Sequence, residues 1–166
     1  SIGKVFQDRA AQYGDKVFLR FEDRDITYRE ANETANRYAA VLAARGVGHG
    51  DVVGIMLRNS PEPVLLMLAA VKCGAISGML NYHQRGDVLK HSLGLLDAKV
   101  LVADPDFVDP INESGAVTER SSPFSRHTVR IDIESLPTGI AMPSAGHSSA
   151  PTACGTGSGR PRTRAS

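Results

Sequence analysis

Between residues 52 and 103, short apolar runs of strand length alternate with longer amphipathic segments of helix length. The runs lie at residues 52–57, 75–80 and 99–103. A continuous apolar run of this length is typical of a strand that is buried on both faces of its sheet. Strands that alternate with helices favour right-handed crossovers and a mainly parallel sheet. This pattern predicts an α/β fold with a partial parallel sheet and flanking helices.

The residues that precede this region predict two helices and a small β-hairpin. Apolar residues recur at helical spacing over 2–13, and alternation over 17–21 followed by a short run at 26–28 is typical of a hairpin. Thr27 and Glu30 have the spacing of a capping box, in which each side chain accepts a hydrogen bond from the backbone N–H of the other residue. The second helix is therefore expected to begin at this pair.

Two further helices are expected to connect the apolar runs. Ser60 and Pro61 predict the N-cap and the first position of a helix that ends near Cys73. Residues 87–96 predict the next helix, with its leucines facing inward. Cys73 lies among apolar residues, which favours a small core residue over a nucleophile.

The second part of the chain has a different composition. Residues 137–166 contain no Asp or Glu and consist mainly of Pro, Gly, Ser, Thr, Ala and Arg. Such a segment lacks the large apolar side chains that offset the entropy lost on ordering, so we expect it to be disordered. We therefore divide the chain into an incomplete folded domain at 1–108 and a low-complexity tail at 109–166, with a short strand predicted at 127–133.

Composition also narrows the classes of function. The 166 residues carry a formal net charge of +1 and only 5% aromatic residues, without Trp, so we expect no nucleic-acid partner. The two cysteines, Cys73 and Cys154, form neither a disulfide framework nor a metal-ligand set. No run approaches the roughly 20 apolar residues that span a bilayer, and no signal-peptide pattern is present, so a cytoplasmic location is expected.

The glycine-rich segment at 155–159 invites comparison with a phosphate-binding loop. Such a loop lies between a strand and a helix, and its glycines let backbone N–H groups approach the anion. The glycine spacing here matches neither the dinucleotide-binding nor the P-loop pattern, and residues 148–151 before it are polar. We interpret the segment as part of a flexible tail.

Other short motifs have simple structural interpretations. The Arg-Gly-Asp tripeptide at 85–87 fits a helix start, where an Asp is favourable. The glycosylation patterns at Asn32 and Asn112 are interpreted as chance matches. His83 and His91 lie eight residues apart without a further ligand nearby, so no metal site is predicted. The sequence identifies no catalytic, cofactor-binding or metal-binding residue and leaves the substrate-binding residues unknown.

A series of short matches runs from residue 26 to residue 104. In order they are Ile26-Thr27-Tyr28, Ala35-Asn36-Arg37, Gly46-Val47, Gly50-Asp51-Val52-Val53, Met56-Leu57-Arg58-Asn59-Ser60-Pro61-Glu62, Lys72-Cys73-Gly74-Ala75, Asn81 and Ala98-Lys99-Val100-Leu101. Through their order and spacing this stretch resembles the adenylate-forming acyl-CoA synthetase superfamily. Residues 81–93 are similar to its fatty-acid transport protein and very-long-chain acyl-CoA synthetase branch, which includes mycobacterial-type long-chain fatty-acid–CoA ligases. The residues shared with that branch are Asn81, Arg85, Asp87, Leu89, His91 and Leu93.

This resemblance implies an enzyme that uses ATP and Mg²⁺ to convert a long-chain fatty acid into an acyl-adenylate, and then coenzyme A to form acyl-CoA. It also implies peripheral association with the inner face of a membrane. Family members are several times longer, and their phosphate loop, acidic ribose contact and catalytic lysine have no counterpart here. We therefore expect an inactive, truncated ligase fragment that binds none of these cofactors tightly. We also hypothesise that residues 109–166 are a frameshift product.

Two other functions stay open at this point. The first is a small α/β module that holds a nucleotide or an acyl chain without turnover, in the loops after Leu57 and Leu80 at the carboxyl ends of strands. The second is a fragment of another carboxylate-adenylating enzyme, acting on an aryl or amino acid, against which the pattern at 81–93 argues. In either case we expect exposed apolar faces, a free strand edge and poor solubility.

Overall fold

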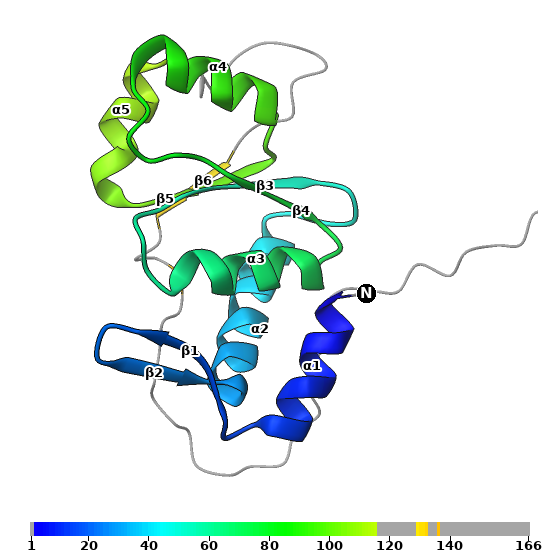
Figure 1. The fold of residues 1–166 in the computed structure, drawn as a ribbon. Helices are drawn as coiled ribbons and strands as arrows, with labels where there is room; N and C mark the ends of the chain where they lie inside the picture. Colours follow the sequence, from blue (N-terminus) through cyan, green and yellow to red (C-terminus); the bar gives the residue numbers. More distant parts are fainter. Residues whose placement is uncertain (1, 116–128, 133–135, 137–166) are drawn as a thin grey trace, which may run out of the picture.

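The computed structural model describes residues 2–115, 129–132 and 136, which form a layered α/β fold (Figure 1). The elements in chain order are α1 (Ile2–Tyr13), β1 (Val17–Phe21), β2 (Arg24–Thr27), α2 (Tyr28–Ala44), β3 (Val52–Met56), α3 (Glu62–Lys72), β4 (Ile76–Met79), α4 (Gly86–Leu96), β5 (Val100–Ala103), the 3-10 helix η1 (Pro105–Phe107), α5 (Val108–Glu113) and β6 (Val129–Asp132). The predicted α/β class is confirmed, as is the antiparallel hairpin of β1 and β2. The expected disorder of 137–166 and the glycine-rich segment at 155–159 lie outside the described residues.

Four parallel strands form the central sheet in the order β4-β3-β5-β6. The chain passes from β3 to β4 on one side and then returns past β3 to β5. Because right-handed crossovers in opposite directions place their helices on opposite faces, α3 covers one face and α4 the other (Figure 1). The predicted parallel sheet is confirmed, and β6 lies within the strand predicted at 127–133.

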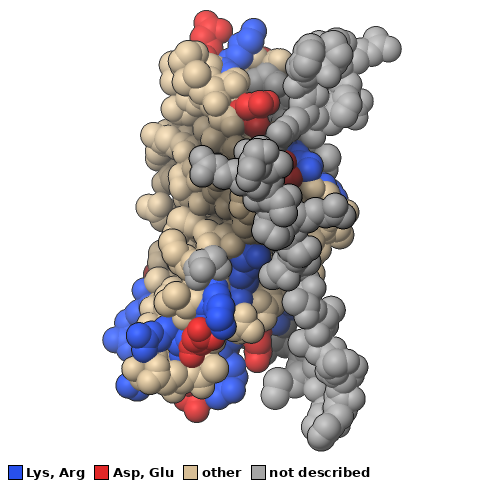
Figure 2. Space-filling view, turned by 90° about the vertical axis from the view of Figure 1, so that its right-hand side faces the viewer, with Lys and Arg blue, Asp and Glu red and all other residues tan. Residues whose placement is uncertain are grey.

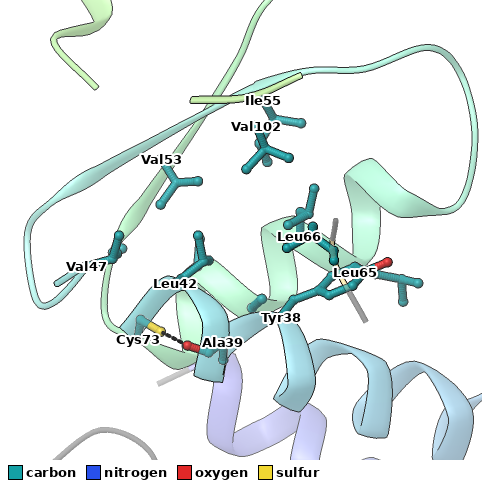
Figure 3. Packing of buried hydrophobic residues seen from close by; sticks show 14 of the residues in the cluster. Tyr38, Ala39, Leu42, Val47, Val53, Ile55, Leu65, Leu66, Cys73 and Val102 are labelled. Carbon is teal, nitrogen blue, oxygen red and sulfur yellow. Dashed lines mark hydrogen bonds between the residues drawn. The ribbon is translucent and has the colours of Figure 1, made fainter. Parts of the chain in front are cut away.

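Two apolar clusters hold the layers together. The larger lies between the sheet and helices α1, α2 and α3, and it includes Tyr38, Leu42 and Ile55 (Figure 3). The smaller lies on the opposite face, where Leu89 of α4 and Ile111 of α5 are fully buried against the sheet. Complete burial of one such side chain contributes about 1.5–3 kcal/mol to the free energy of folding. The packing on both faces of the sheet therefore stabilises the fold.

Cys73 belongs to the larger cluster at the end of α3. Its side chain is buried, and its Sγ donates a hydrogen bond to the carbonyl oxygen of Ala39 at 3.5 Å (Figure 3). The prediction of a small core residue is confirmed.

The capping box at the start of α2 is present. Glu30 N donates to Thr27 Oγ1 at 3.2 Å, and Thr27 N donates to Glu30 Oε2 at 2.8 Å. These hydrogen bonds satisfy N–H groups that the first turn of a helix leaves without partners. The predicted helix start is therefore confirmed at the level of individual atoms.

Helix α2 ends at a glycine. Gly46 has φ +79°, and Val47 N donates across it to Leu42 O at 3.0 Å, which is the bond of a Schellman motif. Helix α3 ends in the same way around Gly74, with φ +72°. A residue with a Cβ would be strained at either position.

Two glycines let α4 approach the sheet closely. Gly54 of β3 and Gly78 of β4 are paired, and Leu96 of α4 lies over both. A Cβ placed on Gly78 would lie 2.0 Å from Leu96 Cδ1, and a Cβ on Gly54 would lie 3.0 Å from Leu96 Cδ2. The distance between helix and sheet thus depends on the absence of side chains at these positions.

The N-cap prediction for α3 is wrong. The helix begins at Glu62 with Pro61 at the cap position, and no side chain caps it. Ser60 Oγ instead donates to the carbonyl of Arg58 at 3.4 Å. The hydroxyl group has a competing backbone acceptor two residues earlier, which the Ser-Pro pattern does not reveal.

A short helical region after β5 was not predicted. It consists of η1 and α5, and Phe107 and Ile111 bury their side chains beneath α4. Helix α5 begins at Val108, where we divided the chain, and extends into the predicted tail. The described structure runs without a gap as far as Gly115. The assignment of residues 109–166 to a low-complexity tail otherwise stays a prediction.

Candidate functional site

The carboxyl edge of the sheet between β3 and β5 is a topological switch point. The chain leaves β3 toward α3 on one face and leaves β5 toward η1 and α5 on the other (Figure 1). In open α/β sheets, ligands bind in the crevice where the loops from neighbouring strands diverge in this way. The loops at this edge are therefore the candidate functional site.

Arg58 joins the loop after β3 to the loop after β5. Its backbone N donates to Asp104 Oδ2 at 2.8 Å, and its guanidinium group pairs with the carboxylate of Asp106. The backbone N of Asp104 donates in turn to Met56 O at 3.3 Å. The Arg58–Asp106 pair is exposed to solvent, so it contributes only about 0–1 kcal/mol to stability. The contact between Asp104 and the backbone is the one that shapes the edge.

Phe107 connects the loop after β4 to this site. Its buried ring stacks on Tyr82 with the centroids 5.7 Å apart and the planes at 20°. The guanidinium carbons of Arg58 and Arg85 lie 5.4 and 5.8 Å from the centroid of the same ring. Arg85 Nη1 also donates to the carbonyls of Tyr82 and Gln84, each at 2.7 Å. The loops after Leu57 and Leu80, which the sequence nominated, therefore meet on Phe107.

The carboxyl edge carries the guanidinium groups of Arg58 and Arg85 and the carboxylate groups of Asp104 and Asp106, so its formal charges balance. The guanidinium groups are suited to bind a phosphate or carboxylate, while Asp106 competes with such an anion for the Arg58 guanidinium and Asp104 already accepts from the Arg58 backbone N–H. In Figure 2 the charged side chains gather at the level of α1 and the hairpin, whereas the visible surface at the level of the sheet is mainly uncharged. Within the part of the chain that the structure describes, no group of three His, Cys, Asp or Glu side chains could hold a metal ion.

A hollow of about 300 Å³ lies beside this edge, next to β4. Gln84 lines it, and Gln84 Oε1 is buried without a hydrogen-bond partner among the described residues. A buried acceptor without a donor is unfavourable by about 1–3 kcal/mol, so this atom is a potential contact for an incoming N–H or O–H group. The lining residues are Met79, Leu80, Asn81, Gln84, Ser92, Leu95 and Leu96.

The other short motifs lie where their structural interpretations placed them. Helix α4 begins at Gly86 with Asp87 in its first turn, as expected for the tripeptide at 85–87. Asn32 lies within α2. The second glycosylation pattern ends in Ser114, which is buried and donates through Oγ to Ile111 O at 2.6 Å. Asn112 itself is exposed, next to the packed end of α5.

Lys72 lies far from this edge, at the end of α3 that leads into β4. Its Nζ donates to Asn32 Oδ1 at 2.8 Å, and burial lowers the pKa of its ammonium group. The contact joins α2 to α3, which is a packing role.

Comparison with known proteins identifies the family. The family model described as AMP-binding enzyme matches residues 6–161, and the chain belongs to this family. The match extends farther along the chain than the residues on which we based the resemblance, which ended near Asp104.

Two curated relatives and one solved structure illustrate the relationship. The chain is 77% identical over 116 residues to the medium/long-chain-fatty-acid–CoA ligase FadD6 of Mycobacterium tuberculosis, covering 70% of this chain and 19% of the relative. It is 34% identical over 114 residues to long-chain fatty acid transport protein 2 of Rattus norvegicus, covering 68% of this chain and 18% of that one. A Mycobacterium tuberculosis fatty acyl CoA synthetase structure matches with a TM-score of 0.68 and 27% identity, over 81% of this chain and 26% of that one.

The chain thus spans about a fifth of the length of these curated relatives. The predicted membership in the adenylate-forming, fatty-acid branch is confirmed at the level of the family. Of the helices in the described residues, none has the length and apolar character needed to cross a membrane.

Proposed function

We propose that this chain is the amino-terminal part of the large domain of an ATP-dependent fatty acyl-CoA ligase. The observation that carries the proposal is the 77% identity to a medium/long-chain-fatty-acid–CoA ligase over 116 residues. In the intact enzyme the substrate is a long-chain fatty acid, and ATP, Mg²⁺ and coenzyme A take part in forming the acyl-adenylate and the thioester. The intact enzyme acts in the cytoplasm or at the inner face of the membrane.

The 166-residue chain on its own forms no acyl-adenylate. Adenylation depends mainly on positioning of ATP phosphates and carboxylate and on electrostatic stabilisation of the charge that develops. The charges of Arg58 and Arg85 are balanced by those of Asp104 and Asp106, so this edge offers no surplus of positive charge to a triphosphate. This part of the enzyme instead supplies a packed frame with a shaped carboxyl edge.

A chimera tests the proposal directly. Residues 2–115 of this chain replace the corresponding segment of FadD6, and formation of acyl-CoA from a long-chain fatty acid is measured. We expect activity within about tenfold of the parent. A tenfold loss corresponds to ~1.4 kcal/mol of transition-state stabilisation. The matching segment of tyrocidine synthase 1, 27% identical to this chain, serves as the control and is expected to abolish activity. A folded but inactive chimera with the present chain contradicts the proposal.

A binding module without turnover is the second candidate, and the two arginines beside Phe107 favour it. Calorimetric titration of the 166-residue chain with MgATP and with a long-chain fatty acid discriminates the two. Saturable binding that Arg58→Ala removes supports the module, whereas no binding supports the ligase fragment. An aryl- or amino-acid-activating enzyme is the remaining alternative, and preference of the chimera for an aryl acid over a fatty acid would support it.

A further inference from the structure

We draw no further inference here: the strongest candidate, the hollow beside β4 that Met79, Gln84 and Leu95 line, carries none, because nothing among the described residues shows what covers it.

Discussion

The ammonium group of Lys99 lies 2.8 Å from Asp51 Oδ2 and ties the start of β5 to the loop that leads into β3. The same ammonium donates to the carbonyl of Gly46 at the end of α2, and Asp51 Oδ2 accepts a further bond from Gly48 N at 2.9 Å. The side chains of Lys99 and Asp51 are only 31% and 14% exposed. One ion pair therefore links three segments at the amino edge of the sheet, opposite the candidate site.

Replacement of Lys99 by Met is expected to lower the free energy of unfolding by about 1–3 kcal/mol, because charge-assisted bonds in a half-buried site are lost. Urea denaturation followed by circular dichroism measures the change. Lys90→Met, at an exposed position of α4, is the control and is expected to shift stability by less than about 0.5 kcal/mol. Equal stabilities for the two variants would show that the Lys99 contact is not structural.

Gly78→Ala is expected to destabilise the chain by about 1–3 kcal/mol, because the added Cβ overlaps Leu96 and displaces α4. Gly94→Ala is the matched control within α4, since a Cβ there meets nothing within 4 Å. It is expected to stabilise the chain by about 0.5–1 kcal/mol through helix propensity. Thermal unfolding of both variants measures the difference. If Gly78→Ala is also stabilising, α4 does not rest on the sheet as described.

The capping box makes part of the stability depend on pH. The backbone N–H of Thr27, followed by its hydroxyl group, lowers the pKa of Glu30 below the ordinary value of 4.5. A lowered folded-state pKa contributes stability that is present above the unfolded-state pKa and lost as pH falls through the folded-state pKa. The stability difference between the wild type and Glu30→Gln is therefore expected at neutral pH and should vanish in acid.

Urea denaturation at several pH values between neutral and acid conditions measures this difference. Glu33→Gln, on the exposed face of the same helix, is the control for a general effect of charge. Thr27→Ala is expected to cost about 0.5–2 kcal/mol at neutral pH. A difference between wild type and Glu30→Gln that is constant with pH would exclude the carboxylate as the source.

Asp104 and Asp106 are predicted to contribute unequally at the carboxyl edge. Asp104→Ala leaves the backbone N of Arg58 without its acceptor and is expected to cost about 1–2 kcal/mol. Asp106→Ala removes only an exposed ion pair and is expected to cost less than about 1 kcal/mol. Chemical denaturation of the two variants in parallel tests the order. The reverse order would mean that the guanidinium pair, rather than the backbone contact, shapes the site.

The origin of residues 109–166 is testable on the coding DNA. If the tail is a frameshift product, another frame across these codons encodes an apolar strand followed by a Thr/Ser/Gly-rich loop that ends in Pro-Lys. Resequencing this region and translating all three frames measures this. If the present frame itself continues into such a loop, or no frame contains one, the frameshift hypothesis is wrong.

The sequence by itself determined the elements whose signals are local. The apolar runs predicted β3, β4 and β5, and the Thr27–Glu30 pair predicted the start of α2, because each signal acts within one or two helical turns or one strand. Local signals failed where a nearby competitor decided the geometry, as when the Ser60 hydroxyl bonded to the Arg58 carbonyl and left α3 without a side-chain cap.

Only the tertiary structure decided the candidate site and the order of the strands in the described sheet. The loops after Leu57 and Leu80 were nominated from the sequence, but Asp104 and Phe107, which join them, were not. Arg58 and Asp104 lie 46 positions apart, and their contact depends on the chain returning from β4 past β3, so that β5 pairs with β3 on its other side. That strand order also leaves β4 at the edge of the described sheet. Strand order follows from the packing of helices on both faces, a property of the whole fold that no short stretch of sequence contains.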